Sequence, residues 1–170
     1  MTALHRRALL AGAASLAALA FGNRPGRAKD MTTTDAIDFK ALSDAEWRKR
    51  LTPAQYDILR GHGTERAGSS PLDHEKRKGV FACGGCDLPL FSSDAKFDSG
   101  TGWPSFTAPL AGAVETKTDR SFFIKRTEVH CARCVGHLGH VFDDGPAPTG
   151  LRYCMNGLAL AFHPAQPTAS

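Results

Sequence analysis

Four of the five cysteines in the chain form two close pairs. Cys83 and Cys86 make one C-x-x-C motif, and Cys131 and Cys134 make a second. Such spacing suits a tetrahedral zinc ion, because each motif brings two thiolates to one point. Four cysteine ligands leave no position for a substrate, so the site would be structural. We therefore expect one structural Zn²⁺ per chain, bound by these four residues.

Two other arrangements of the paired cysteines remain open. If the protein is exported, it meets an oxidising compartment in which two disulfides form readily. A redox-active C-x-x-C is a further alternative, although neither motif lies in the βαβ pattern that usually surrounds one. The paired spacing favours zinc over both.

The fifth cysteine, Cys154, has charged and polar neighbours. If its segment is a strand, Arg152, Cys154 and Asn156 share one face, because side chains alternate along a strand. A guanidinium beside a thiol stabilises the thiolate and lowers its pKa from about 8.5, which produces a nucleophile. A small buried residue that only fills space is the simpler alternative. The arginine favours a reactive Cys154.

Two histidines stand three residues apart in the motif His137-Leu-Gly-His140, and a pair of aspartates that ends at Asp144 follows them. Each imidazole could be structural, or the pair could bind a metal. Because four cysteines already complete a zinc site, we expect the histidines to act as acid–base partners of a thiolate. Trp103 and Phe106 lie on a Pro-containing turn and form either a core cluster or an apolar wall for a small methyl-bearing group.

The elements that carry these residues are short. Ser43 with Glu46, and Thr52 with Gln55, have capping-box spacing, which predicts two N-terminal helices. From Gly79 onward, turn residues separate short β-type runs. The predicted strands are 80–82, 121–129, 152–160 and 161–162. We expect a mainly β, antiparallel domain with two short helices before it.

Residues 1–28 have the features of a removable export signal. Arg6 and Arg7 precede an apolar run that is too short to span a membrane as a helix. The adjacent arginines favour twin-arginine export to a bacterial periplasm, with a Sec signal as the alternative. Cleavage after Ala20 and cleavage after Ala28 both fit, and we expect no stable membrane anchor once the signal is removed.

The 170 residues suit one compact domain. Four of the 21 basic residues lie in residues 1–28, which contain no acidic residue, so the remaining 17 balance the 17 acidic residues. A neutral body argues against a nucleic-acid partner, because phosphate binding requires a positive field. We divide the chain into a signal (1–28), a linker (29–42), one folded domain (43–165) and a tail (166–170).

Three longer motifs stand out in the chain: GTGWPSF at 100–106, HLGHVFDDGP at 137–146 and GLRYCMN at 150–156. Together with shorter matches at 51–53, 63–66 and 91–93, they resemble one enzyme family, the peptide-methionine (R)-S-oxide reductases or B-type methionine sulfoxide reductases. The resemblance extends from about Asp44 to Pro164 and contains several independent motifs. It implies two antiparallel sheets with N-terminal helices.

The resemblance also implies a role for each matched residue. Cys154 resembles the nucleophile that attacks the sulfoxide sulfur of the R epimer and becomes a sulfenic acid. The residues that resemble its supporting groups, for the sulfoxide oxygen, its proton and the thiolate, are His137, His140, Asp144, Asn156 and Arg152. Trp103 and Phe106 resemble the pocket for the ε-methyl group. The paired cysteines match the zinc ligands of many members.

The implied substrates are oxidised methionines in proteins and peptides, and the implied reductant is a thioredoxin-like protein or a small thiol. Many members have a resolving cysteine where this chain has Thr101. The usual internal disulfide with Cys154 is therefore not expected, and an external thiol would reduce the sulfenic acid directly.

Two other functions account for less of the sequence. A non-enzymatic zinc-binding module leaves Cys154 and the histidines unused. A zinc hydrolase built on the histidine pair lacks a clear third ligand.

Overall fold

The computed structural model describes residues 37–120 and 125–166 of the chain. The predicted export signal, the first part of the linker, the start of the predicted strand 121–129 and most of the tail lie outside the described residues. The compact unit begins at Ile37. Within the described residues, no helix has the length and apolar character needed to cross a membrane.

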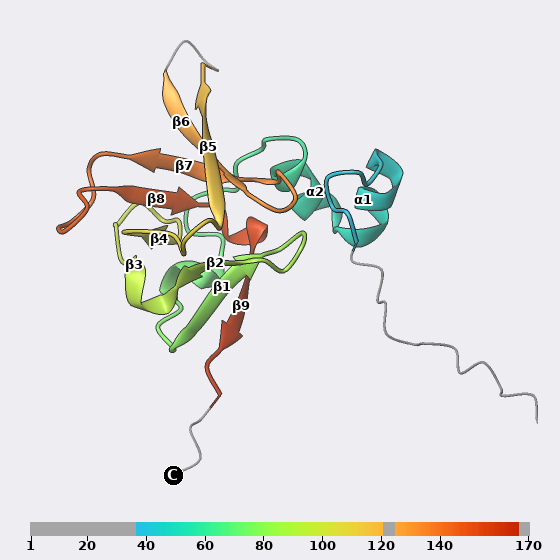
Figure 1. The fold of residues 1–170 in the computed structure, drawn as a ribbon. Helices are drawn as coiled ribbons and strands as arrows, with labels where there is room; N and C mark the ends of the chain where they lie inside the picture. The colour runs from blue at the N-terminus through green and yellow to red at the C-terminus, as the bar shows by residue number, and fades with distance from the viewer. Residues whose placement is uncertain (1–36, 121–124, 167–170) are drawn as a thin grey trace, which may run out of the picture. The chain divides into compact units, whose positions relative to one another are not determined.

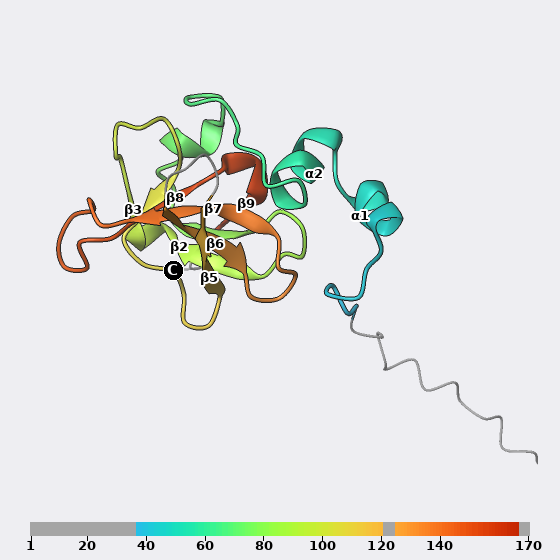
Figure 2. The same ribbon diagram turned by 90° about the horizontal axis from the view of Figure 1, so that it is seen from above.

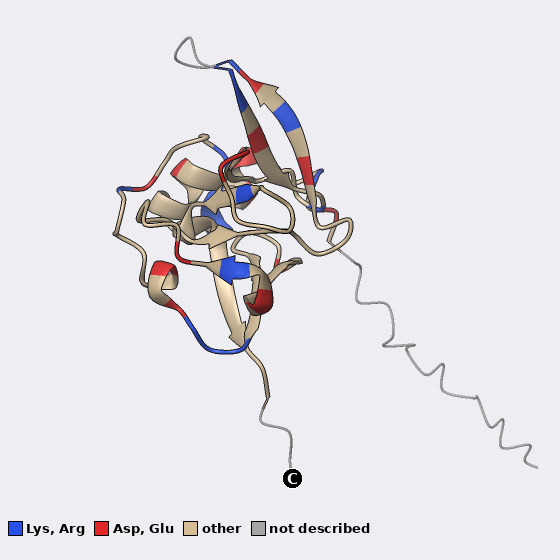
Figure 3. Ribbon diagram, turned by 90° about the vertical axis from the view of Figure 1, so that its left-hand side faces the viewer, with Lys and Arg blue, Asp and Glu red and all other residues tan. Residues whose placement is uncertain are grey.

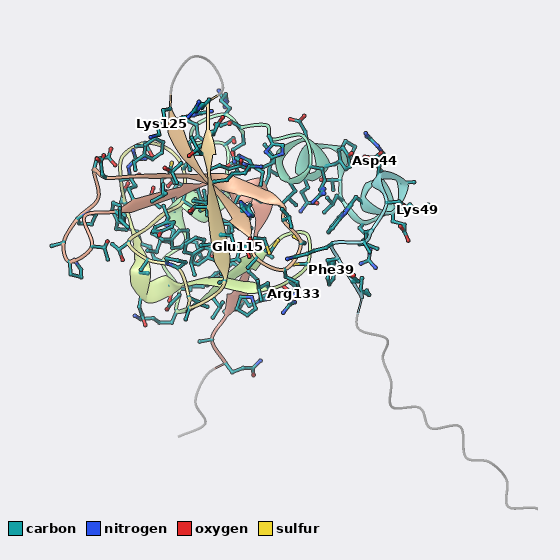
Figure 4. The ribbon with its side chains drawn as sticks, turned by 45° about the horizontal axis from the view of Figure 1, so that its top comes forward. Phe39, Asp44, Lys49, Glu115, Lys125 and Arg133 are labelled. Carbon is teal, nitrogen blue, oxygen red and sulfur yellow. The ribbon has the colours of Figure 1, made fainter. Side chains whose placement is uncertain are left out.

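Two short helices precede the sheets, α1 (Asp44–Arg50) and α2 (Pro53–Leu59). Both begin at the predicted capping boxes: the Ser43 amide donates to the Glu46 carboxylate at 2.8 Å, and Thr52 pairs with Gln55 in the same way. Trp47 of α1 is buried, and the ring of Phe39 lies against it with centroids 6.1 Å apart. Phe39, labelled in Figure 4, lies just before α1. The end of the expected linker is thus attached to the domain.

The rest of the described chain forms two antiparallel sheets, as the sequence predicted (Figure 1). The first sheet has the order β2-β1-β9, and the second has the order β3-β4-β8-β7-β6-β5. The strands are β1 (Gly79–Cys83), β2 (Pro89–Ser92), β3 (Lys96–Phe97), β4 (Ser105–Phe106), β5 (Val114–Asp119), β6 (Arg126–Cys131), β7 (His137–Phe142), β8 (Arg152–Met155) and β9 (Leu160–Pro164). Among the described residues, a 3₁₀ turn at Pro71–His74 precedes β1, and two more lie between strands, at Ser93–Ala95 and Gly157–Ala159.

The prediction of one strand over 152–160 is wrong. The chain leaves the large sheet after β8, makes the 3₁₀ turn, and enters the small sheet as β9. At the break, the buried carboxylate of Glu65 accepts hydrogen bonds from the amides of Gly157 at 2.6 Å and Leu158 at 2.9 Å. These amides therefore have a side-chain partner in place of a neighbouring strand.

Aromatic side chains pack the two sheets together. Phe106 of β4 stacks on Phe91 of β2 with centroids 4.3 Å apart, and it meets the edge of Phe81 of β1 at 5.0 Å. All three side chains are fully buried. The core therefore lies between the small sheet and the β4–β8 part of the large sheet.

The β5–β6 hairpin extends from the large sheet and bears charges of both signs (Figure 3). Figure 2 shows α1 and α2 on one side of the sheets. Across the hairpin, Lys117 of β5 is paired with Glu128 of β6, and Asp119 with Arg126. This charged hairpin borders the site described next.

Candidate active site

Three neighbouring strands of the large sheet bring the chemically active residues together. Cys154 of β8 lies opposite His140 of β7 on one side and opposite Ser105 of β4 on the other. Directly opposed residues of an antiparallel pair project to the same face. The sheet register therefore places a thiol, an imidazole and a hydroxyl on one face.

The thiol of Cys154 lies at a cavity of about 150 Å³. The cavity is lined by Thr64, Trp103, Arg126, Gly139, His140, Phe142, Cys154 and Asn156. At a share of about 30 Å³ per water molecule, it has room for roughly five waters. The size suits the end of one side chain, since pockets for larger ligands start at about 300 Å³.

Trp103 stands at this cavity as predicted, but Phe106 does not. The Trp103 indole donates to the Glu65 carbonyl oxygen at 3.1 Å, which fixes the ring at the cavity wall. Phe106 is opposite Tyr153, so it projects to the core face while Ser105 and Cys154 project to the site face. Phe142 of β7 supplies the second aromatic wall instead.

Hydroxyl groups surround the Cys154 sulfur. The Thr101 Oγ1 lies 3.9 Å from the Cys154 Sγ, and Ser99 hydrogen-bonds both Thr101 and Ser105 at 2.8 Å. Burial raises the pKa of the Cys154 thiol, and Thr101, Arg152 and Ser105 offset this only in part. Arg152 lowers the pKa of Cys154, as predicted, but desolvation of the thiolate has the larger effect, so the net shift is upward.

Arg152 is held from two sides. Its Nε and Nη2 each donate to Asp144 at 2.8 Å, and its guanidinium lies 4.5 Å from the centroid of the Phe142 ring. The Asp144 carboxylate raises the pKa of Arg152, and the nearby Cys154 adds to this. A bidentate pair of this kind fixes both position and direction of the guanidinium.

His140 has a carboxylate partner that the sequence did not reveal. Its Nε2 lies 2.8 Å from the Asp119 Oδ2, and the same oxygen accepts from Arg126 at 2.7 Å. Asp119 belongs to β5, two strands away from β7. The carboxylate orients the imidazole beside Cys154.

His137 lies one step farther from the thiol. Its ring is 5.4 Å from that of His140, and it lines a neighbouring cavity of about 300 Å³ rather than the Cys154 cavity. An irregular register between β6 and β7 lets residues three apart in β7 face the same side.

A buried carboxylate holds His137 in place. The Nδ1 of His137 lies 2.8 Å from the Glu128 Oε1. Burial opposes ionisation of Glu128, but hydrogen bonds from His137 and Lys117 outweigh it and lower the pKa of Glu128. Burial also lowers the pKa of His137. A neutral imidazole thus donates through Nδ1 to a carboxylate, which leaves Nε2 as an acceptor.

Gly139 allows β7 to lie close to β8 at the reactive residue. A Cβ at this position would stand 2.1 Å from the carbonyl oxygen of Cys154. No side chain fits at that distance, so the spacing of His140 from Cys154 depends on the glycine.

Comparison with known proteins identifies the same family that the sequence motifs at 100–106, 137–146 and 150–156 resemble. The SelR domain model matches residues 51–164. A peptide methionine sulfoxide reductase MsrB of Agrobacterium fabrum is 56% identical over 72% of this chain and 91% of its own length. An MsrB of Bradyrhizobium diazoefficiens is 52% identical over 81% and 97%, respectively. The chloroplastic peptide methionine sulfoxide reductase B1 of Arabidopsis thaliana is 54% identical over 77% of this chain and 65% of its own. The chain belongs to the B-type peptide methionine sulfoxide reductase family.

This B-type reductase also contains the predicted four-cysteine cluster. Cys83 and Cys134 have sulfurs 3.6 Å apart, and Cys86 and Cys131 have sulfurs 3.5 Å apart. These separations are far longer than a disulfide bond of about 2.05 Å. They approach the edge of a tetrahedron with metal–sulfur bonds of about 2.3 Å, which is roughly 3.8 Å. All four side chains are buried and free, and they fit a structural metal site.

The four-cysteine cluster joins the two sheets of the reductase. Cys83 ends β1 of the small sheet, and Cys131 ends β6 of the large sheet. Arg60, at the end of α2, donates to the Cys134 carbonyl oxygen at 3.0 Å. Arg133 of the second motif (labelled in Figure 4) donates to the Cys86 carbonyl oxygen of the first motif at 3.1 Å. A metal there would tie together segments that are far apart in the sequence.

Asn156 of the reductase is tied to the loop before the sheets. Its Oδ1 accepts from the Glu65 amide at 3.0 Å, and its Nδ2 donates to the Leu138 carbonyl oxygen at 3.1 Å. Since the Glu65 carbonyl also holds Trp103, one buried residue positions two parts of the cavity wall.

Sequence reasoning found Asp144 but missed three other carboxylates near the site and one aromatic wall. Phe142 follows His140 by two residues, so alternation along a strand could have found it. Asp119 and Glu128 carry no local signal, because each meets its histidine only through the pairing of distant segments. Glu65 lies within the match at 63–66, but its contact with Gly157 likewise arises only from the fold.

Proposed function

We propose that this protein reduces the R epimer of methionine sulfoxide in proteins and peptides to methionine. The observation that carries the proposal is the face shared by Cys154 and His140 beside a small cavity with the aromatic walls Trp103 and Phe142. Family membership supports the same reaction.

The Cys154 sulfur is the nucleophile. It attacks the sulfoxide sulfur, the S=O bond breaks, and the oxygen ends on Cys154 as a sulfenic acid together with the proton of the original thiol. The Cys154 sulfur loses two electrons, and the substrate sulfur gains them to become a thioether. Arg152, held by Asp144, stabilises the thiolate that forms during attack.

His140 handles the proton. A sulfoxide oxygen leaves only when it is protonated, so an acid must stand beside the attacking sulfur. His140 lies opposite Cys154 and is oriented by Asp119. His137 packs against His140 from the neighbouring cavity and is held there by Glu128.

The two aromatic walls select the substrate. Trp103 and Phe142 form the apolar part of the cavity and receive the methyl group. Arg126, Thr64 and Asn156 form its polar part. Methyl, oxygen and chain then each have a separate wall, which distinguishes one epimer from the other.

An external thiol returns the enzyme to its reduced form. The thiol attacks the Cys154 sulfenic acid, water leaves, and a mixed disulfide forms that a second thiol reduces. Thr101 at 3.9 Å from the sulfur offers no second thiol. A small thiol or a thioredoxin-like protein serves as reductant.

The ion in the four-cysteine cluster is Zn²⁺, one per chain. The all-cysteine donor set with tetrahedral sulfur spacing supports zinc. Elemental analysis of purified protein should give about one zinc per chain. Metal-free, folded protein with disulfides at these positions would contradict this.

The protein acts after twin-arginine export, in a periplasm. The support is the Arg6-Arg7 pair before an apolar run. Replacing both by lysine should leave precursor in the cytoplasm, as cell fractionation would detect. Undiminished export of the double variant would indicate the Sec route instead.

Three variants test the reaction. Cys154→Ser should abolish reduction of a peptide containing R-methionine sulfoxide with dithiothreitol as reductant, while zinc content and the circular dichroism spectrum stay unchanged. His140→Ala should lower kcat by about 10²–10⁴-fold. Phe106→Leu, a core change, should affect stability far more than KM. Full activity of Cys154→Ser, or preference for the S epimer, would overturn the proposal.

A further inference from the structure

A second group of metal-binding side chains lies outside the four-cysteine cluster. His62, Glu128 and His137 each offer one ligand atom, and these three atoms lie within 4.8 Å of one another. The Oε1 of Glu128 is 3.0 Å from the Nδ1 of His62 and 2.8 Å from the Nδ1 of His137. We propose that His62, Glu128 and His137 form a binding site for an imidazole-preferring divalent metal ion such as Ni²⁺ or Zn²⁺.

The donor set and its spacing fit such an ion. Two imidazoles and one carboxylate oxygen are ligands of Zn²⁺ and Ni²⁺, whereas Mg²⁺ and Ca²⁺ prefer oxygen alone. Around an ion with bonds of about 2.0–2.1 Å, tetrahedral ligand atoms are roughly 3.3 Å apart. The two distances from the Glu128 oxygen, 3.0 and 2.8 Å, are slightly shorter, so each imidazole nitrogen needs to move from that oxygen by only a few tenths of an ångström. The two nitrogens lie within 4.8 Å of each other.

The two imidazoles can exchange their hydrogen bonds to Glu128 for bonds to a metal ion, and within the described part of the chain the buried Nε2 of His137 has no hydrogen bond that this exchange would break. Binding through Nδ1 moves the proton of each ring to Nε2. Among the described residues, the Nε2 of His137 is buried and has no hydrogen-bond partner. The His62 side chain is about half exposed, at 52%, so an ion can reach the site from solvent.

The cavity beside the three ligands has room for further ligands. It measures about 300 Å³ and also reaches His140. Its charges are mixed: Arg126 is paired with Asp119, and Lys117 lies 3.1 Å from the second oxygen of Glu128. Because Lys117 competes with an ion for the same carboxylate, it should weaken metal binding without preventing it.

A bound ion would inhibit the enzyme, and this consequence rests on the proposed function. His137 packs against His140, and an ion that holds His137 and fills the adjoining cavity changes the surroundings of the proton donor. Metal binding itself does not depend on the reaction, so the two parts are tested separately.

Binding is measured by calorimetry with NiCl₂ on untagged, zinc-loaded protein that carries Cys154→Ser, which removes the reactive thiol as a ligand. We expect one equivalent of Ni²⁺ to bind, with unchanged zinc content, and no heat from MgCl₂. Adding His62→Ala should weaken Ni²⁺ binding at least about tenfold. Lys117→Met should strengthen it. His163→Ala is the matched control, because His163 is an exposed histidine paired with one carboxylate only, Asp87 at 2.6 Å.

Inhibition is measured with Cys154 intact. Ni²⁺ should inhibit sulfoxide reduction reversibly, and His62→Ala should relieve the inhibition while it leaves the activity without Ni²⁺ unchanged. Equal Ni²⁺ affinity of the His62→Ala and control proteins would overturn the site. Binding that depends on His62 in a protein without reductase activity would contradict the proposed function alone.

Discussion

Burial and a neighbouring guanidinium act on the Cys154 thiol in opposite directions, and burial has the larger effect. A raised pKa keeps the resting residue as a thiol near neutral pH, so the fraction of thiolate grows as the pH rises.

The first prediction concerns this pH dependence. Alkylation of Cys154 by iodoacetamide should accelerate about tenfold per pH unit from pH 7 and continue to rise above pH 9, where an ordinary thiol with a pKa of about 8.5 levels off. Arg152→Ala should move the curve to still higher pH, and Arg152→Lys should move it less. Peptide mass spectrometry separates Cys154 from the metal-site cysteines, and a plateau below pH 8 would contradict the raised pKa.

The second prediction concerns Thr101. Its Oγ1 is 3.9 Å from the Cys154 Sγ, so a cysteine in its place needs only a small shift to form a bond of about 2.05 Å. Thr101→Cys should form a disulfide with Cys154 after one equivalent of sulfoxide, and thioredoxin should then support turnover better than before. In the unchanged protein, a sulfenic-acid trap should label Cys154 alone. An internal Cys154 disulfide in that protein would mean that a metal-site cysteine acts as resolver.

Each C-x-x-C motif is followed directly by a residue whose backbone φ is positive, in the left-handed region. Asp87 has φ of 59° after the first motif, and Val135 has φ of 59° after the second. Aspartate tolerates this region, but a β-branched side chain is strained there. Val135 is also partly exposed, at 41%, so its side chain contributes little packing.

The third prediction follows from this strain. Val135→Gly should stabilise the metal-loaded protein by about 0.5–1 kcal/mol, since relief of about 1–2 kcal/mol exceeds the entropy cost of glycine in the unfolded chain. Asp87→Gly is the comparison at the equivalent position and should raise the free energy of unfolding by less. Urea unfolding measures both, and a Val135→Gly protein that is less stable than Asp87→Gly would refute the argument.

At the scale of the described structure, the four-cysteine cluster and the face that carries Cys154 and His140 lie in different parts of the fold. The cluster joins the end of β1 to the end of β6, whereas Cys154 lies on β8 within the large sheet. The N-terminal helices support the cluster, because a Cβ on Gly85 would meet the Trp47 ring at 3.3 Å. A metal ion bound by the four cysteines would stabilise the arrangement of the two sheets at a distance from Cys154.

The fourth prediction concerns metal removal. Chelation should lower the midpoint of thermal unfolding sharply, because the ion connects two sheets and its binding free energy contributes directly to folding. Activity should fall in parallel with the loss of folded protein and return when Zn²⁺ is added with a thiol reductant. Differential scanning calorimetry and activity on the same samples test this. Folded but inactive metal-free protein would instead give the metal a direct part in catalysis.

The sequence alone was sufficient for features that depend on local spacing. The capping boxes at Ser43 and Thr52 predicted both helices, the C-x-x-C pairs predicted the metal cluster, and the motifs around Trp103 and Cys154 predicted the family. These signals are local because a cap, a metal-binding turn and a motif each involve residues a few positions apart.

The tertiary structure decided which side chains face the site and how charged groups balance. Strand register placed Phe106 in the core and Phe142 at the cavity, and the 3₁₀ turn at Gly157–Ala159 divided a predicted strand between two sheets. Asp119 and Glu128 reach the histidines only after three strands pair. The pKa of Cys154 likewise depends on burial, which arises from the packing of the whole domain rather than from its neighbour Arg152.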